Sequence, residues 1–465
     1  MLVNIDMKNT KSKIDVNSID NSTMNVICEK LSYVKTGFGV PNPRKYMINP
    51  RTGITFTGLI PYVIDILRKN GYQYKINDMR VTPVKKFNWT VHFPFPLRDY
   101  QQRIINAAVA KKRFVCMACT SSGKTLTMAH IIVKFGVKTI VIAPKASLSV
   151  QLQKEFTKFF NMPIGLVNGT TFDVQNITIA TPQTLKNHPE IVKQAEALFI
   201  DEFHNEPSDT IASIAAMADN AYYRIGVSGS PWRDDGTDII MDAYFAPRNP
   251  KDVIMSSELI RKGILTPVSI TIKNMESRCG WLGSYDKTYD AAIVNNKKRN
   301  DDIIATAVNE IGKGHPTLIL ITKINHGYKL LNMLKDKVEN KSYNVVYDNK
   351  NYTVHTVEIV TGSDDMNRRE AIFQAIRDGK CMCMIASTIA DEGLDIVPLQ
   401  TLILANGGMA TTRLFQRIGR VIRKYEKKKT AYVYDYRDSN PTMYEHAMVR
   451  YQLMKMEPAW QIKII

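Results

Sequence analysis

Eight residues, Ala118 to Thr125, have the composition of a phosphate-binding loop: Ala-Cys-Thr-Ser-Ser-Gly-Lys-Thr. They lie between an apolar, strand-like run and a helix-like run. A buried strand that ends in a tight turn and continues as a helix directs several backbone N–H groups and the positive helix end at one point, which suits a polyphosphate. Gly123 lets the backbone approach closely, Lys124 would reach the outer phosphates, and the Thr125 hydroxyl would hold Mg²⁺. The other loop positions that we expect to contact a nucleotide are Thr120, Ser121 and Ser122.

Two adjacent carboxylates follow a second apolar run. Residues 197–200 lead directly into Asp201 and Glu202, and His204 follows. Beside a phosphate loop, the carboxyl end of such a strand is where a metal ion and an attacking water would be handled. We expect Asp201 to bind Mg²⁺, Glu202 to act as general base, and His204 to couple hydrolysis to motion. Alone, the acidic pair would equally suit a helix N-terminus, so the assignment depends on the Lys124 loop.

A helix expected just before the loop would supply the contact to the base. Tyr100 offers a ring that could stack on a purine, and Gln101 offers an amide that could read its edge, which favours adenine. The alternative is an ordinary helix start capped by Asp99.

An arginine cluster near the C-terminus carries a third set of candidates. Gln416, Arg420 and Arg423 have the spacing i, i+4 and i+7, which places them on one helical face. Two guanidiniums on one face suit the charge that spreads over a γ-phosphate in its transition state. A basic surface helix is the alternative. Upstream, Ser387 and Thr388 follow a strand-like run, and Asp395 would take a ribose hydroxyl unless this is an ordinary strand-to-helix turn.

The elements that must position these groups form two series. Short apolar strands alternating with longer helical stretches predict α/β lobes with mostly parallel sheets buried on both faces. The expected strands are 114–118, 139–143, 177–180, 197–200 and 224–228 in the first lobe, and 317–321, 354–359, 382–386, 401–404 and 431–434 in the second.

The first ninety or so residues have a different pattern. Residues 8–24 are polar and predict no defined fold beyond a loose hairpin or a frayed arm, whereas 25–91 predict a small α+β domain. Its clearest element is an amphipathic helix from Leu59 to Asn70 that Gly71 would end. Residues 46–56 predict two strands around a turn. Phe93-Pro94-Phe95-Pro96 predicts a stiff, extended link to the first lobe.

Composition points to a polyanionic partner. The 465 residues carry a formal net charge of +18, an excess that favours nucleic acid over a merely solvated basic surface. No apolar run is long enough to cross a bilayer, and no secretory h-region is visible, so we expect a soluble intracellular protein. The pairs Cys116/Cys119 and Cys381/Cys383 lie in apolar runs, which favours buried packing over metal binding.

Together these residues resemble the superfamily 2 helicases, and among them the phage UvsW-type branch-migration helicases and their XPB-like relatives. Gly229 stands where this family usually has alanine. The N-terminal segment 46–72 is similar to the small leading domain of UvsW-type proteins, and Arg233-Asp234-Asp235 to an element of the XPB group. The motifs that carry the resemblance are, in order, Tyr100-Gln101, Ser122 to Thr125, Ala143 to Leu148, Ala180 to Leu185, Asp201 to His204, Ser228 to Ser230, Leu318 to Lys323 with Asn325 to Gly327, Thr388 to Asp395, and Gln416 to Arg423.

The resemblance implies an ATP- and Mg²⁺-dependent 3′–5′ DNA helicase that acts on single-stranded and branched DNA, without a membrane, in the cytoplasm (of the host, if phage-encoded). Recombination or single-strand-binding proteins would be its protein partners. It implies an N-terminal substrate-selecting domain (1–93), RecA-like lobe 1 (94–270), a connector (271–290) and RecA-like lobe 2 (291–465). Alternatives are an RNA helicase and a DNA-binding scaffold with a vestigial ATPase. The expected nucleic-acid contacts are Lys145, Thr181, Gln183, Ser387 and Thr388.

Overall fold

The computed structural model describes residues 2–34, 44–202, 208–229, 238–249, 252–277, 279–387, 396–408 and 411–465. The chain divides into two compact units: Met1–Ala118 with Ser122–Ile254, and Cys119–Ser121 with Met255–Ile465. Within the described residues, no helix is both long enough and apolar enough to cross a membrane.

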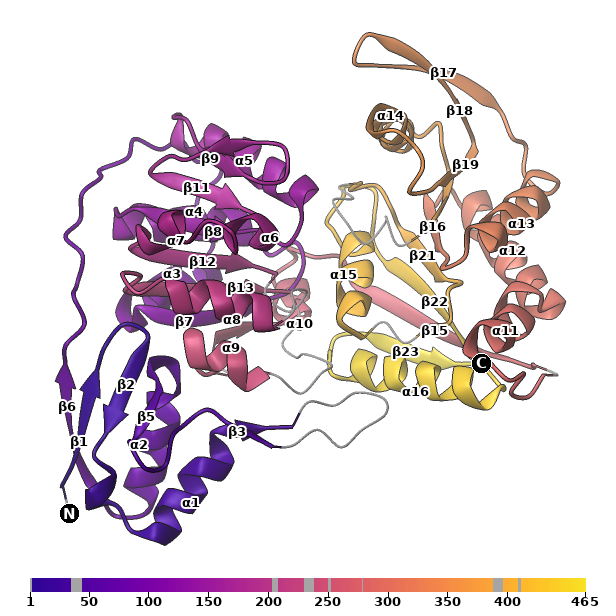
Figure 1. The fold of residues 1–465 in the computed structure, drawn as a ribbon. Helices are drawn as coiled ribbons and strands as arrows, with labels where there is room; N and C mark the ends of the chain where they lie inside the picture. Colours follow the sequence, from indigo (N-terminus) through magenta and orange to yellow (C-terminus); the bar gives the residue numbers. More distant parts are fainter. Residues whose placement is uncertain are drawn as a thin grey trace. The chain divides into compact units, whose positions relative to one another are not determined.

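The first unit begins with a small α+β domain. Its sheet has the strand order β5-β2-β1-β6, in which β1 pairs antiparallel with β2 and parallel with β6 (Figure 1). Alternation along β1 places Val3 and Ile5 in the core and leaves Leu2 and Asn4 exposed. The elements are β1 Leu2–Met7, β2 Lys11–Ile14, η1 Val16–Ser18, α1 Asn21–Lys30, β3 Ser32–Tyr33, β4 Lys45–Tyr46, β5 Ile54–Phe56, η2 Thr57–Leu59, α2 Ile60–Lys69 and β6 Gln73–Asp78.

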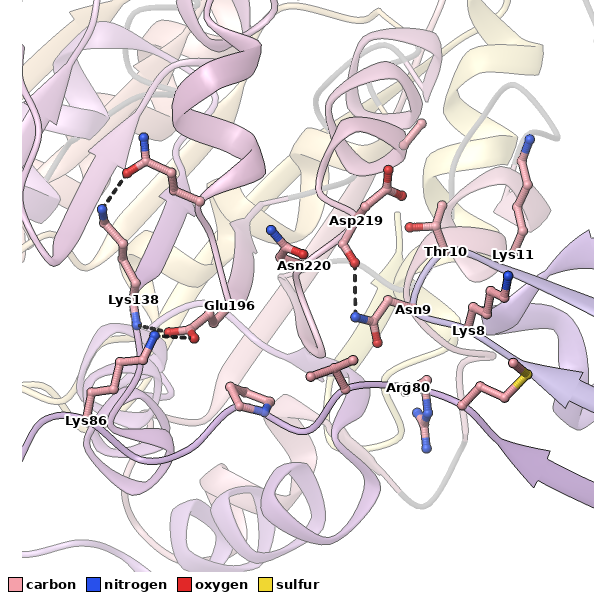
Figure 2. A pocket seen from close by; sticks show the side chains of 15 residues that line it. Lys8, Asn9, Thr10, Lys11, Arg80, Lys86, Lys138, Glu196, Asp219 and Asn220 are labelled. Atoms are coloured by element: carbon pink, nitrogen blue, oxygen red, sulfur yellow. Dashed lines mark hydrogen bonds and ion pairs between the residues drawn. The ribbon is translucent and has the colours of Figure 1, made fainter.

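Two buried arginines fasten the β1–β2 turn to the larger domain of the same unit. The Arg224 guanidinium, fully buried, donates to the Thr10 hydroxyl at 2.9 Å. Arg113 donates to the backbone carbonyls of Asn9 and Tyr244, and burial, followed by the charge of Arg224, lowers its pKa. The Asn9 amide in turn donates to the Asp219 carbonyl at 3.0 Å (Figure 2). Segments more than 200 residues apart are therefore joined by charged, buried hydrogen bonds.

An extended link connects this small domain to lobe 1. The Lys86 and Phe87 N–H groups donate to the Gly136 carbonyl at 2.8 and 3.0 Å. The Phe93 ring stacks on His130 with ring centroids 3.7 Å apart, and Trp89 packs edge-on against Phe160. Aromatic side chains and backbone hydrogen bonds thus hold the link along the lobe.

Lobe 1 is a sheet covered on both faces. Its strand order is β10-β9-β11-β8-β12-β13-β7-β14, and every pair except β10–β9 is parallel. The carboxyl ends of these parallel strands therefore meet at one edge, and their amino ends at the other. The strands are β7 Arg113–Ala118, β8 Thr139–Ile142, β9 Gly165–Val167, β10 Phe172–Asp173, β11 Ile177–Ala180, β12 Ala197–Asp201, β13 Tyr223–Ser228 and β14 Val253–Ile254.

The helices of lobe 1 form two groups. In one, α4 packs between α3 and α5; in the other, α8 packs against α6, α7 and α9. Their bounds are α3 Asp99–Lys111, α4 Lys124–Phe135, α5 Ala146–Phe160, α6 Pro182–Leu185, α7 Pro189–Lys193, α8 Ser208–Met217 and α9 Asp238–Tyr244.

The second unit contains a parallel sheet of its own, with the order β19-β20-β16-β21-β22-β15-β23. An antiparallel hairpin, β17–β18, packs against α14. The strands are β15 Val268–Met275, β16 Thr317–Leu320, β17 Ser342–Tyr347, β18 Lys350–His355, β19 Val357–Val360, β20 Cys383–Ala386, β21 Thr401–Leu404, β22 Ala431–Asp438 and β23 Gln461–Ile464; the helices are α10 Ser256–Arg261, α11 Tyr285–Tyr289, a π-helix Asp290–Val294, α12 Lys297–Gly312, α13 Ile324–Lys335, α14 Met366–Arg377, α15 Thr411–Val421 and α16 Pro441–Lys455.

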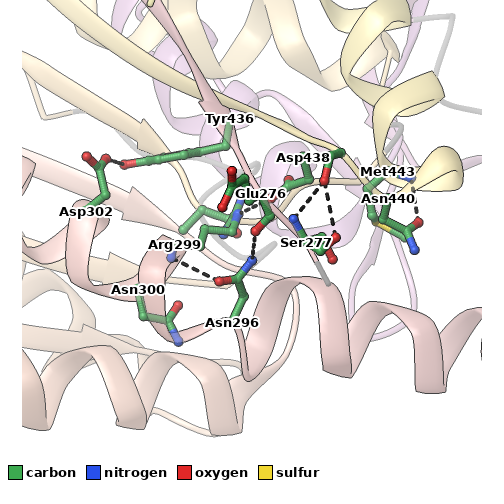
Figure 3. A network of polar contacts seen from close by, with 12 residues as sticks. Glu276, Ser277, Asn296, Arg299, Asn300, Asp302, Tyr436, Asp438, Asn440 and Met443 are labelled. Carbon is green, nitrogen blue, oxygen red and sulfur yellow. Dashed lines mark hydrogen bonds and ion pairs between the residues drawn. The ribbon is translucent and has the colours of Figure 1, made fainter. Parts of the chain in front are cut away.

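A buried polar network joins helix α12 to the carboxyl ends of this second sheet (Figure 3). The Arg299 side chain, 0% exposed, pairs with Asp438 at 3.1 Å and donates to the Ala405 carbonyl at 2.8 Å. On α16, Arg450 pairs in the same way with Asp435. In this lobe, buried guanidiniums are thus neutralised by buried carboxylates, which fix helices to the sheet.

The predicted α/β class with two parallel-sheet lobes is confirmed. Residues 8–24, for which no defined fold was predicted, contain β2, η1 and the first four residues of α1. The prediction of a single strand over residues 354–359 was wrong, because these residues are divided between β18 and β19. In the latter case Val354 belongs to the hairpin, where it pairs with Tyr343, and the chain enters the main sheet only at Val357.

Candidate nucleotide site

The predicted phosphate loop connects β7 to α4. Gly123 is the N-cap of α4 and has φ +80°. The positive φ favours glycine, and a Cβ at this position would lie 2.5 Å from Gln101 Nε2, so that a larger residue would also displace this amide. Ser121 also has a positive φ, +68°, which stores strain in the loop. Lys124 and Thr125 begin the helix, and Thr120 lies in the turn before it.

Tyr100 and Gln101 support the backbone of this loop through their side chains. The Tyr100 hydroxyl donates to the Ser122 carbonyl at 2.7 Å, and Gln101 Nε2 approaches the carbonyls of Ser122 and Gly123 at 3.3 and 3.4 Å. The two side chains are only 1% and 2% exposed. The expectation that the Tyr100 ring stacks on a purine is therefore wrong in this structure, because the ring is buried beneath the loop. Its position instead supports the loop backbone.

The acidic pair lies at the same edge of the sheet as the loop. Asp201 is the last residue of β12, and Glu202, with φ +50°, leaves the strand in a strained conformation. Lys124 forms an ion pair with Glu202, whose other carboxylate oxygen accepts the Gly229 N–H at 3.0 Å. Burial, followed by the charge of Glu202, raises the pKa of Asp201 to about 7, while Lys124 opposes that rise. The structure thus brings together Lys124, Asp201 and Glu202.

The residues present fit a nucleotide with a divalent cation. Asp201 Oδ1 and Ser122 Oγ are buried and have no hydrogen-bond partner among the described residues. Each such oxygen is costly unless a ligand or water satisfies it. Hard oxygen donors beside a lysine and a helix N-terminus are the set that Mg²⁺ and phosphate prefer.

The expected nucleic-acid contacts of lobe 1 lie along the same edge. Lys145 caps α5 after β8 and is exposed. Thr181 caps α6 after β11 and contacts Thr184 at 3.0 Å, while Gln183 is exposed. In the other lobe, Ser387 follows β20 and is buried.

The arginine helix is shorter than its sequence spacing suggested. Gln416 and Arg420 lie on α15 and are 9% and 8% exposed. The helix ends at Val421, and Arg423 instead forms a β-bridge with Leu265. The expectation that all three share one helical face was therefore wrong for Arg423, since pairing with the strand-like segment at Leu265 ends the helix.

Several sequence candidates lie outside the described residues: His204, Ser230, Arg233-Asp234-Asp235, Thr388 and Asp395.

The structure describes both of the cysteine pairs that the sequence analysis considered. Cys116, Cys381 and Cys383 are buried and Cys119 is half-buried, all as free thiols, and no cluster of metal-binding side chains occurs in the described part of the chain.

Comparisons with known proteins fit this geometry. Residues 94–233 match the family model described as type III restriction enzyme, res subunit, and residues 301–425 match the helicase conserved C-terminal domain. DNA 3′-5′ translocase XPB2 of Sulfurisphaera tokodaii is 27% identical over 362 residues, which cover 72% of this chain and 82% of that protein. The chain belongs to the superfamily 2 helicases.

Two further similarities agree with these matches, one in sequence and one in fold. The ATP-dependent DNA helicase uvsW of Enterobacteria phage T4 is 24% identical over 361 residues, 73% of this chain and 68% of the relative. A solved fragment of a putative HsdR subunit of a type I restriction enzyme from Vibrio vulnificus has the same fold, with TM-score 0.54 and 17% identity over 81% of this chain and 70% of its own. This helicase is accordingly an ATP-dependent enzyme of the DNA helicase and translocase family, of the UvsW type.

Sequence reasoning missed the supporting residues. Arg113 is the first residue of β7 and Arg224 the second residue of β13, and an arginine near the start of a buried strand was the available signal. The bracing role of Tyr100 had no such signal, because it depends on the packing of α3 against α4.

Proposed function

We propose that this helicase is an ATP-driven DNA motor that moves 3′ to 5′ and acts on branched DNA such as forks, displaced loops and four-way junctions. The observation that carries the proposal is the Lys124–Glu202 ion pair beside Asp201, at the edge where the phosphate loop ends. The names of two relatives, a DNA 3′-5′ translocase and an ATP-dependent DNA helicase, support the polarity and the choice of DNA.

Each residue of the nucleotide site would have its own role in ATP hydrolysis. Lys124 would leave Glu202 to bind the outer phosphates, Thr125 and Asp201 would hold Mg²⁺, and Glu202 would take a proton from the attacking water. Bound Mg²⁺ would supply neutralisation of charge on the phosphates. The strain at Glu202 fits such a rearrangement, since a residue held at φ +50° is costly to keep in place.

Residues elsewhere in the chain would assist hydrolysis and bind the DNA. Gln416, Arg420 and Arg423 would act on the transferring phosphoryl group, with His204 coupling hydrolysis to motion. Lys145, Thr181, Gln183, Ser387 and Thr388 would contact the DNA backbone. Residues 1–93 would select the substrate. The enzyme would work in branch migration in the cytoplasm, beside recombination or single-strand-binding proteins.

A strand-displacement panel tests the substrate and the polarity. Forked, looped, four-way and linear DNAs with a 3′ or a 5′ tail are incubated with the full chain and Mg·ATP. The proposal predicts ATP-dependent displacement on branched and 3′-tailed DNA. Equal activity on 5′-tailed linear DNA, or none on any DNA alongside activity on RNA, would refute it.

A further inference from the structure

A groove lies between the small N-terminal domain and lobe 1, within the first unit (Figure 2). Its volume is 910 Å³. Among the described residues, five cations line it, against two carboxylates, Glu196 and Asp219. The cations are Lys8, Lys11, Arg80, Lys86 and Lys138.

This groove is separate from the nucleotide site. Lys138 immediately precedes β8 and Glu196 immediately precedes β12, so the groove lies at the amino edge of the lobe 1 sheet. The acidic pair lies at the carboxyl edge. With a rise of about 3.3 Å per residue, Glu196 and Glu202 are about 20 Å apart along the strand.

Two of the lysines lie on a backbone segment that buried hydrogen bonds hold in place. Lys8 and Lys11 flank the β1–β2 turn, in which Asn9 and Thr10 accept hydrogen bonds from the buried guanidiniums of Arg113 and Arg224. Both lysine side chains are exposed, and neither forms an ion pair within the described part of the chain. By contrast, Lys86 is engaged with Glu196 at 2.6 Å.

The composition of the groove indicates its ligand. Unpaired lysines around an open groove can neutralise the phosphates of a nucleic-acid backbone, and each neutralised phosphate releases its counterions. Among the described residues that line the groove, none is aromatic, so it lacks the stacking platform that single strands use. A lysine ammonium binds a phosphate as a point charge on a flexible stem, without the fixed fork geometry of an arginine.

We propose that this groove is a second nucleic-acid site, which binds the phosphate backbone of duplex DNA without sequence preference. Its use for the duplex arm of a branched substrate rests on the proposed function. Because Arg113 and Arg224 lie at the amino ends of the strands that end at the phosphate loop and at Ser228, the arm is held at a fixed distance from the nucleotide site.

Duplex binding by a double variant tests the proposal. Anisotropy titrations of a labelled 20-bp blunt duplex and a 20-nt single strand compare the wild-type chain, Lys8→Gln/Lys11→Gln, and the control Lys335→Gln/Lys337→Gln, which removes two exposed lysines of the second unit. Each lost phosphate contact lowers affinity about fivefold at 0.15 M salt and the salt slope by about 0.9. We expect the groove variant to lose about 25-fold in duplex affinity and about 1.8 in slope, with single-strand binding unchanged.

The other outcomes overturn the proposal. Unchanged duplex binding, an equal loss in the control, or a loss confined to single-stranded DNA each contradicts a duplex site in the groove. Thermal melting of both variants shows whether the fold is retained. The proposed function is tested separately by single-strand-stimulated ATP hydrolysis, which the groove variant should keep; absence of that stimulation in the wild type refutes the motor and leaves the duplex measurement interpretable.

Discussion

Strand β12 is preceded by Glu196 and followed by Glu202, and these two glutamates differ in their surroundings more than in their own chemistry. Glu196 and Glu202 are each 16% exposed, each pairs with a lysine, and each accepts one backbone N–H. Glu202, however, follows Asp201, whose Oδ1 is buried and whose pKa is raised, and it has a positive φ and pairs with Lys124 of the phosphate loop. Glu196 has ordinary backbone geometry and borders an open basic groove.

This difference shows how one parallel sheet separates two tasks. At the carboxyl edge, loops that leave the strands bring a lysine and two acids to one point. At the amino edge, buried arginines bind backbone carbonyls and anchor the small domain. The position along the strand, rather than the residue type, decides which glutamate is suited to catalysis.

The largest effect should come from the carboxyl edge. Glu202→Gln removes the proposed general base, so DNA-stimulated ATP hydrolysis should fall roughly a thousandfold while DNA binding is retained. The matched control Glu196→Gln removes the same charge and a similar lysine pair from the opposite end of β12, and should keep near wild-type turnover. Steady-state phosphate release measures the turnover of both variants. Comparable losses in the two would contradict the assignment of catalysis to the carboxyl edge of the sheet alone.

At the amino edge, the expected effect is on stability. Arg224→Met leaves the carbonyls of Ala215, Ala218 and Ala221 without their donor, so the free energy of unfolding of the first unit should fall by about 3 kcal/mol. Hydrogen exchange should increase first in β1 and β2, which the guanidinium fastens through Thr10. Protection of those strands equal to that in the wild type would contradict the anchoring role.

A pH effect is expected where the small domain meets α9. Burial raises the pKa of Asp242 to about 6, and the carboxyl accepts the Tyr62 hydroxyl at 2.8 Å. Because the folded pKa lies above the unfolded value, the unfolded chain loses its proton first as pH rises from about 4 to about 6, and stability falls across that window by at most about 3 kcal/mol. Urea unfolding at several pH values should show this fall, and Asp242→Asn should flatten it; the same slope in both proteins would exclude Asp242 as its source.

The smallest expected effect concerns Gly229. A Cβ there would lie 3.1 Å from Lys124 Nζ and 3.4 Å from Glu202 Oε2. Gly229→Ala should therefore loosen the Lys124–Glu202 pair and lower KM for ATP by about twofold, an effect of about 0.4 kcal/mol, with kcat retained. A large drop in kcat would show that the glycine has a further role.

Much of the site was predictable because its signals are local. Apolar runs of the right length predicted the strands, and the turn residues after them predicted the phosphate loop and the acidic pair. The helix expected at Leu59 to Asn70 is α2, and Gly71 beyond it has φ +76°.

The remainder depends on contacts between distant segments. Strand β1 is stabilised by pairing with β6, more than sixty residues later, and its short alternating pattern alone does not indicate that partner. The burial of Tyr100 and the end of α15 before Arg423 are likewise set by tertiary packing. Sequence spacing describes an isolated helix or strand, whereas these residues are placed by their neighbours.

We propose that the carboxyl edge of lobe 1 hydrolyses ATP for a DNA motor. ATP hydrolysis by the full chain, with and without single-stranded DNA and in parallel with Lys124→Ala, tests this role directly. We predict a DNA-stimulated rate that the variant loses while its DNA affinity is unchanged. Undiminished stimulated turnover in Lys124→Ala would contradict the account.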